Sequence, residues 1–181
     1  TVSGLTVEGR GSDLGFIRYV EAGAVVKDLT LQVRVRPEGS QTGIGGVAGQ
    51  NEGTIENCTV SGLVEGGEEV GGIAGRNLES GLIRSCSNQA AVTGNTRTGG
   101  IAGYNTGVLQ GCRNEGAVNI TENEKATDTG GIAGRSAGSI TDCVNRGDVG
   151  YQHTGYNSGG IAGLQSGSIQ GCENYGTILG R

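Results

Sequence analysis

Five near-identical phrases constrain what this chain of 181 residues can fold into. Each reads Gly-Gly-(Val or Ile)-Ala-Gly and is followed by a Gly, an aliphatic residue and a Cys. The phrases begin 26 to 31 residues apart, at Gly45, Gly71, Gly99, Gly130 and Gly159. A period of this length is typical of one supersecondary unit stacked on copies of itself. The chain is therefore expected to fold as a solenoid and not around a single central core.

Residue types recur at fixed offsets inside each repeat. An aliphatic residue lies three positions before each Cys, and a Val or Ile lies six positions after it. Such columns place like side chains on top of one another in a stack, so they mark the interior. The predicted structural core comprises Ile55, Cys58, Ile83, Cys86, Leu109, Cys112, Ile140, Cys143, Ile169 and Cys172.

The apolar segments indicate β-strands. They are too short for helices and lack the spacing of an amphipathic helix, whereas their Val and Ile residues favour strands. The 39 glycines recur largely at fixed positions, where they permit tight corners with positive φ. We predict an all-β fold, a parallel β-helix (β-solenoid) of about six rungs stacked about 4.8 Å apart, with three short strands per rung. Right-handed crossovers between parallel strands are strongly preferred, so a right-handed coil is predicted.

The whole chain reads as a single β-solenoid fragment, residues 1–181. Residues 1–8 resemble the second half of a rung, residues 9–42 form a degenerate rung, and residues 43–181 hold the five regular rungs. The sequence is therefore interpreted as a piece excised from a longer solenoid. Terminal rungs of solenoids are normally capped, and bare strand edges pair with other strands. We accordingly predict end-to-end self-association of this fragment.

Two polar columns run beside the apolar ones. Asn side chains stacked at corners can hydrogen-bond along a column and tolerate left-handed backbone. A structural role is therefore favoured over ligand binding. The first column comprises Asn51, Asn77, Asn105, Ser136 and Gln165, and the second comprises Asn88, Asn114, Asn145 and Asn174.

The five cysteines occupy one position of the repeat and are predicted to point inward. Free Cys behaves as a small hydrophobe in protein cores, so free, buried thiols are favoured. A disulfide stays an alternative, because neighbouring turns lie within the reach of one, although side chains stacked in register do not readily adopt its torsion. A zinc site is disfavoured, since the chain has no CxxC and a single His. No cofactor is expected.

Charge and hydropathy argue against two classes of partner. The net charge is −5 with both signs scattered, whereas a nucleic-acid partner requires a basic stripe. No segment approaches the ~18 consecutive apolar residues of a membrane span, so membrane insertion is not expected.

The phrase GGIAGxNxGxIxxCxNxG, represented by residues 99–116, resembles the GLUG repeat. The resemblance extends over nearly the whole chain. It implies a β-helical segment of an exported bacterial surface protein, such as an adhesin-like protein or the non-catalytic part of an IgA-protease-like peptidase. The implied location is extracellular or at the cell surface. No catalytic residue carries over, because the HExxH motif of such peptidases is absent here.

The repeats differ mainly in the loops before the Gly-Gly pair, and insertions in solenoids often collect on a binding face. Residues 150–158 hold Tyr151, His153 and Tyr156, which are candidate contacts for a host glycan or protein. In the alternative reading, the tyrosines pack on the loop or the neighbouring rung. Residues 119–129 carry three carboxylates that could bind a cation weakly, but a solvated loop is favoured.

Catalysis is not predicted. Glycoside hydrolysis needs two carboxylates across a groove, and Asp142 and Asp148 have no acidic counterparts in register in the next rung. His153 lies in a loop without a nucleophile elbow. The sequence therefore favours a structural or spacer segment that is not an enzyme. The alternative is an adhesin-type module that binds a host glycan or protein through the loop edge 119–158.

Overall fold

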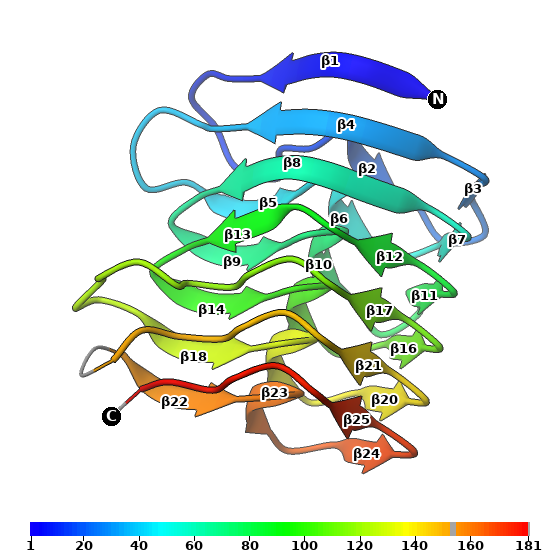
Figure 1. Cartoon of the computed structure of the whole chain (residues 1–181). Coiled ribbons are helices and arrows are strands. Elements are labelled where there is room, and N and C mark those ends of the chain that lie inside the picture. Colours follow the sequence, from blue (N-terminus) through cyan, green and yellow to red (C-terminus); the bar gives the residue numbers. More distant parts are fainter. Residues whose placement is uncertain (153–154, 181) are drawn as a thin grey trace.

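The computed structural model describes residues 1–152 and 155–180. The described chain forms short parallel β-strands, β1 to β25, and no helix. They stack as a β-solenoid of about six turns that descends from β1 to β25 (Figure 1). In this view the front strands run from right to left and the chain returns behind them, so the coil is right-handed, as predicted.

Four parallel sheets form the walls of the solenoid. Sheet A contains β1 (Val2–Val7), β4 (Thr30–Val35), β8 (Thr59–Glu65), β12 (Ser87–Asn88), β13 (Ala91–Thr93), β17 (Arg113–Asn114), β21 (Val144–Asn145) and β25 (Glu173–Asn174). Sheet B contains β5 (Thr42–Gly45), β9 (Glu68–Gly71), β14 (Thr96–Gly99), β18 (Thr127–Gly130) and β22 (Tyr156–Gly159). Sheet C contains β2 (Ile17–Val20), β6 (Ala48–Asn51), β10 (Ala74–Asn77), β15 (Ala102–Asn105), β19 (Ala133–Ser136) and β23 (Ala162–Gln165). Sheet D contains β3 (Val25–Lys27), β7 (Thr54–Glu56), β11 (Leu82–Arg84), β16 (Val108–Gln110), β20 (Ser139–Thr141) and β24 (Ser168–Gln170).

The prediction of three strands per rung is wrong, because each complete turn contributes a strand to four sheets. The extra corner falls inside the repeated phrase. In the first regular rung, β5 ends at Gly45 and β6 begins at Ala48. One continuous phrase in the sequence therefore belongs to two strands, and the bend between them falls at Gly46 and Val47.

The strand register within each sheet pairs equivalent residues of successive turns. Ala74 pairs with Ala48 on one side and with Ala102 on the other. In the degenerate rung, Ile17 pairs with Ala48 and so takes the place of the repeated Ala. Larger side chains fit there because β2 is the outermost strand of sheet C.

Eight of the ten predicted core residues are buried, from Ile55 to Cys143. The other two lie in the last turn. Ile169 is 43 % exposed and Cys172 is only half-buried. Their equivalents in the preceding turn, Ile140 and Cys143, are 0 % exposed. The difference arises because a residue in a solenoid is covered by the turns on both sides, and in this chain no turn stacks on the last one.

Two glycines of the repeated phrase lie where a side chain would have no room. A Cβ atom on Gly103 in sheet C would lie 2.3 Å from the backbone carbonyl carbon of Glu69 in sheet B. A Cβ atom on Gly100 would lie 2.2 Å from Cγ of Asn114. The first glycine thus lets two sheets pack backbone to backbone, and the second leaves room for an Asn column.

Both predicted polar columns form hydrogen-bonded ladders, except that Gln165 of the first column donates to the backbone carbonyl of Gly138 at 3.2 Å. In sheet C, Nδ2 of Asn51 donates to Oδ1 of Asn77 at 2.7 Å, and Asn77 donates to Asn105 at 2.8 Å. The ladder continues from Asn105 to the hydroxyl of Ser136 at 3.0 Å. In sheet A the equivalent distances along Asn88, Asn114, Asn145 and Asn174 are 2.9, 2.8 and 2.7 Å.

Candidate functional surface

The predicted ligand contacts lie at the loop edge formed by residues 119–158. Tyr151 is 39 % exposed, and Tyr156, at the start of β22, is 52 % exposed. The N–H of Tyr156 donates to the carbonyl of Ala126 at 3.0 Å, which fixes its backbone against the preceding loop. His153 lies outside the described residues. Both side chains are therefore partly accessible, and a Tyr ring combines an apolar face with a polar hydroxyl, which suits contact with sugars or proteins.

The long loop 119–129 is anchored to the preceding turn. Asn119 is buried, and its side chain accepts a hydrogen bond from the N–H of Gly94 at 2.9 Å and donates to Oγ1 of Thr129 at 3.0 Å. Asn123 donates to the carbonyl of Gly94 and to Oδ1 of Asn95, both at 3.2 Å. These bonds hold the loop at a defined edge of the rod.

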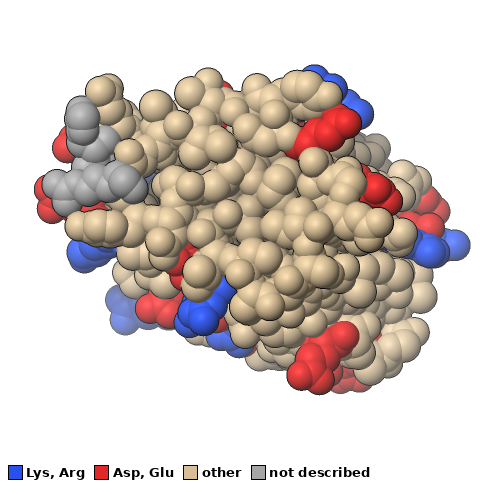
Figure 2. Space-filling view, turned by 90° about the horizontal axis from the view of Figure 1, so that it is seen from below, with Lys and Arg blue, Asp and Glu red and all other residues tan. Residues whose placement is uncertain are grey.

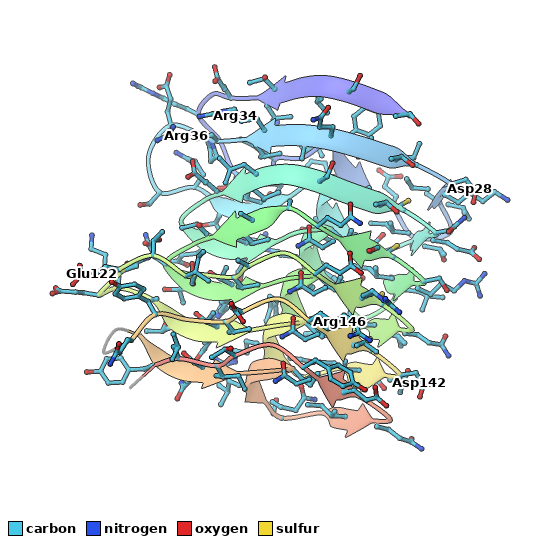
Figure 3. All side chains as sticks on the ribbon, viewed as in Figure 1. Asp28, Arg34, Arg36, Glu122, Asp142 and Arg146 are labelled. Atoms are coloured by element: carbon cyan, nitrogen blue, oxygen red, sulfur yellow. The ribbon has the colours of Figure 1, made fainter. Side chains whose placement is uncertain are left out.

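The acidic residues of this loop do not converge. Glu122 is exposed and projects from the edge (Figure 3). Asp128 is instead part of β18, where its Oδ1 accepts a hydrogen bond from Asn157 at 2.7 Å. Within the described ranges, no group of three or more His, Cys, Asp or Glu side chains could hold a metal ion.

An ionic cluster, which we call the B–C cluster, lies where sheets B and C meet. It comprises Asp13, Glu69, Arg76, Arg97 and Tyr104. The carboxylate of Glu69, whose side chain is 8 % exposed, pairs with Nε of Arg76 and, at 2.6 Å, with Nη1 of Arg97. Arg76 also reaches Oδ1 of Asp13 at 3.1 Å, and the Arg97 guanidinium lies 5.3 Å from the centre of the Tyr104 ring. Both carboxylates are thus neutralised inside the cluster.

Sequence reasoning did not find the B–C cluster, because its partners come from different turns. Glu69 and Arg97 also have φ values of 53° and 57°, a left-handed conformation that is uncommon for these residue types. The available signal was the position two residues before each Gly-Gly pair, which is polar or Gly throughout.

A second left-handed column precedes the Cys column, at the opposite edge of the rod from Glu122 (Figure 3). It includes Asp28 and Asp142, with φ values of 56° and 51°. Short polar residues tolerate this conformation and make the corner from sheet D to sheet A. Asp148, the other carboxylate of that rung, accepts a hydrogen bond from the N–H of Thr177 at 2.9 Å. Asp142 and Asp148 therefore both have structural roles here.

An open groove of about 430 Å³ lies beside the corner from sheet C to sheet D. Its lining consists of Glu52, Leu78, Glu79, Ser80 and Thr106. The Ser80 hydroxyl donates to the backbone carbonyl of Glu52 at 2.7 Å, so it helps to hold the corner in place. The lining provides hydroxyls and carboxylates over one aliphatic side chain, without a base paired to a nucleophile.

The five thiols are free and follow one column of the interior. The N–H of Cys112 donates to the sulfur of Cys143 at 3.4 Å, and that of Cys143 donates to the sulfur of Cys172 at 3.4 Å. Hydrogen bonding to Cys143, together with burial, raises the pKa of Cys112 well above 9.0. Burial likewise raises the pKa of Cys172. Since the thiolate is the reactive form, a raised pKa lowers the reactivity of these two thiols at neutral pH.

The fold and surface together define a repeat-built parallel β-solenoid. Residues 40–64 match the sequence model of the family described as "Glug: The GLUG motif", so the chain contains the GLUG repeat expected from its sequence. Halomucin of Haloquadratum walsbyi (strain DSM 16790 / HBSQ001) is 36 % identical over 78 residues, which cover 41 % of this chain and 1 % of that protein. No solved structure matches. Among the described residues, no helix is long and apolar enough to cross a membrane.

Proposed function

We propose that this chain is a non-catalytic structural segment that acts as a rigid spacer in an exported surface protein. The pair of amide ladders carries the proposal, because they join successive turns by side-chain hydrogen bonds of 2.7–3.0 Å. A rod whose turns are bonded in this way resists bending, and each turn lengthens it by about 4.8 Å. A location outside the cell or on its surface is in line with a relative whose name denotes a mucin.

Binding and turnover assays test this proposal. The folded protein would be applied to arrays of glycans and host proteins, and incubated with acidic polysaccharides. A spacer should show no reproducible specific binder and should release no product. A reproducible ligand would refute the spacer role, whereas released oligosaccharide would refute the non-catalytic assignment.

The exposure of Tyr151 and Tyr156 favours a second candidate, an adhesin-type module that binds a host glycan or protein at the loop edge 119–158. The double variant Tyr151→Ala/Tyr156→Ala should then abolish binding and leave the circular dichroism spectrum unchanged. Tyr19→Ala is the matched control, since Tyr19 is also 52 % exposed but lies in β2, at the other end of the rod. Binding that survives the double substitution would place the contact elsewhere.

A further inference from the structure

Arg135 is a partly buried cation without an anionic partner. It is the one residue of β19 that is not buried, and it forms no ion pair with any described residue. The other lysines and arginines of residues 1–152 and 155–180 either form an ion pair or are exposed. Burial of a cation without an anion is unfavourable, so the guanidinium of Arg135 is suited to an anion supplied by a ligand.

Two turns earlier, the equivalent positions form an ion pair. Glu69, two residues before its Gly-Gly pair, contacts Arg76, five residues after the first glycine of that pair. Asp128 and Arg135 occupy the same two positions, and the φ of Asp128 is 51°, close to the 53° of Glu69. The Asp128 side chain is one methylene shorter, and its Oδ1 accepts a hydrogen bond from Asn157 at 2.7 Å. No ion pair joins Asp128 to Arg135, both of which the structure describes, so Arg135 lacks the internal partner that Arg76 has.

A tyrosine lies close to Arg135 in the architecture of the loop edge 119–158. Asp128, in the same turn as Arg135, is joined through Asn157 to β22, which begins at Tyr156. Tyr156 is 52 % exposed. A guanidinium binds a carboxylate through two parallel hydrogen bonds, and a tyrosine ring combines an apolar face with a polar hydroxyl. This combination matches the carboxylate and the ring of a uronic acid.

The charge distribution favours a specific contact over a general basic surface. Seen from below, basic and acidic side chains are interspersed around the margin of the rod (Figure 2). An acidic ligand is therefore expected to be held by one particular cation and not by an extended basic patch.

We propose that the adhesin-type candidate function, on which this inference rests, is the binding of an acidic glycan. The carboxylate of a uronic acid residue binds the guanidinium of Arg135, and the sugar ring lies toward Tyr156. An acidic peptide is disfavoured, because extended peptides bind by adding a strand to a free sheet edge. β19 offers no such edge, since it is paired with β15 on one side and β23 on the other.

Isothermal titration calorimetry with three probes tests the proposal. The probes are an oligogalacturonate, a neutral oligosaccharide of the same length, and polyglutamate. The folded chain should bind the oligogalacturonate at least about tenfold more tightly than either of the others, because a charge-assisted hydrogen bond is lost in the neutral sugar. Arg135→Gln should weaken this binding by a similar factor. Arg34→Gln is the matched control and should leave the affinity unchanged, since Arg34 also forms no ion pair with a described residue but lies in β4 of sheet A (Figure 3).

Asp128→Glu is a second variant that keeps the Arg135 side chain. It restores the longer carboxylate found at Glu69, which should pair with Arg135 and so weaken binding of the oligogalacturonate. Circular dichroism establishes that each variant is folded. Unchanged affinity in Arg135→Gln or in Asp128→Glu would overturn the proposal, as would equally tight binding of polyglutamate. Equal binding of the neutral sugar would overturn it and leave the adhesin-type candidate standing, whereas binding of no glycan at all would refute both.

Discussion

The amide ladder of sheet A offers the sharpest test of what stabilises the rod, through the substitution Asn114→Ala. The Asn114 side chain is fully buried and takes part in three hydrogen bonds. Its Nδ2 donates to the carbonyl of Gly116 and to Oδ1 of Asn145, both at 2.8 Å, and its Oδ1 accepts from Asn88 at 2.9 Å.

The expected cost follows from those three bonds. A typical intramolecular hydrogen bond contributes about 1 kcal/mol net, and a buried polar group left without a partner costs a further ~1–3 kcal/mol. Asn114→Ala removes three bonds and leaves Oδ1 of Asn145 unpaired in the interior. We therefore expect the free energy of unfolding to fall by about 4–6 kcal/mol.

Asn174→Ala is the matched control, because it changes the same residue type in the same ladder at the exposed end. It removes two hydrogen bonds, at 2.8 and 2.7 Å, in a position where water can replace them. The expected loss is about 1 kcal/mol or less. Urea unfolding followed by circular dichroism measures both values. Equal losses for the two variants, or a loss below about 0.5 kcal/mol for Asn114→Ala, would refute the reasoning.

Three further predictions concern the ion pairs, the glycines and the thiols. Glu69→Gln should lower the free energy of unfolding by about 2 kcal/mol, because it leaves two guanidinium groups without their buried carboxylate partner. Glu38→Gln, in the exposed pair with Arg10, should lower it by less than about 0.5 kcal/mol. Similar losses for the two variants in denaturant titrations would contradict this prediction. Gly103→Ala should lower the free energy of unfolding by more than about 3 kcal/mol, because sheets B and C must separate to admit the methyl group. Gly111→Ala should lower it by about 1–2 kcal/mol, since its φ is 60° but nothing lies closer than 3.9 Å to its Cβ position. Thermal melts that rank the two variants the other way would show that backbone contact does not cause the loss in Gly103→Ala. The raised pKa of the Cys112 thiol means that folding favours its protonated form. Its contribution to the stability of the fold should therefore be complete below the ordinary thiol pKa of 9.0 and be lost as the pH rises above that value. Cys112→Ala should lessen the fall in stability at alkaline pH, and an unchanged pH profile of stability would contradict the raised pKa of Cys112.

Much of the architecture could be predicted because a solenoid encodes its contacts at fixed offsets. Residues such as Ile83 and Asn114 meet their equivalents in the neighbouring turns, so aligning the repeats amounted to aligning the contacts. This is why the parallel fold, the core columns and the amide ladders were all found. For the same reason, Ile169 was predicted to be buried although it is 43 % exposed. Alignment treats every repeat alike, so it does not show that Ile169 lies in the last strand of sheet D.

The candidate surface was less accessible to such reasoning. Tyr151 and Tyr156 were found because the loop before β22 departs from the repeat, and both are exposed. Their role in binding stays a prediction, as does the bacterial origin expected from the resemblance. The end-to-end self-association expected from the sequence likewise stays a prediction.

By itself, the sequence determined that like residues stack on like residues in a parallel β-solenoid, because the period and the columns leave few other ways to bury Ile, Val and Cys together. Only the tertiary structure decided that each turn has four walls, since the bend between the strands of sheets B and C depends on backbone contact between those sheets. It also decided that Glu69 meets Arg76 and Arg97 across turns. These features depend on corner dihedral angles and interatomic distances, which a residue pattern does not specify.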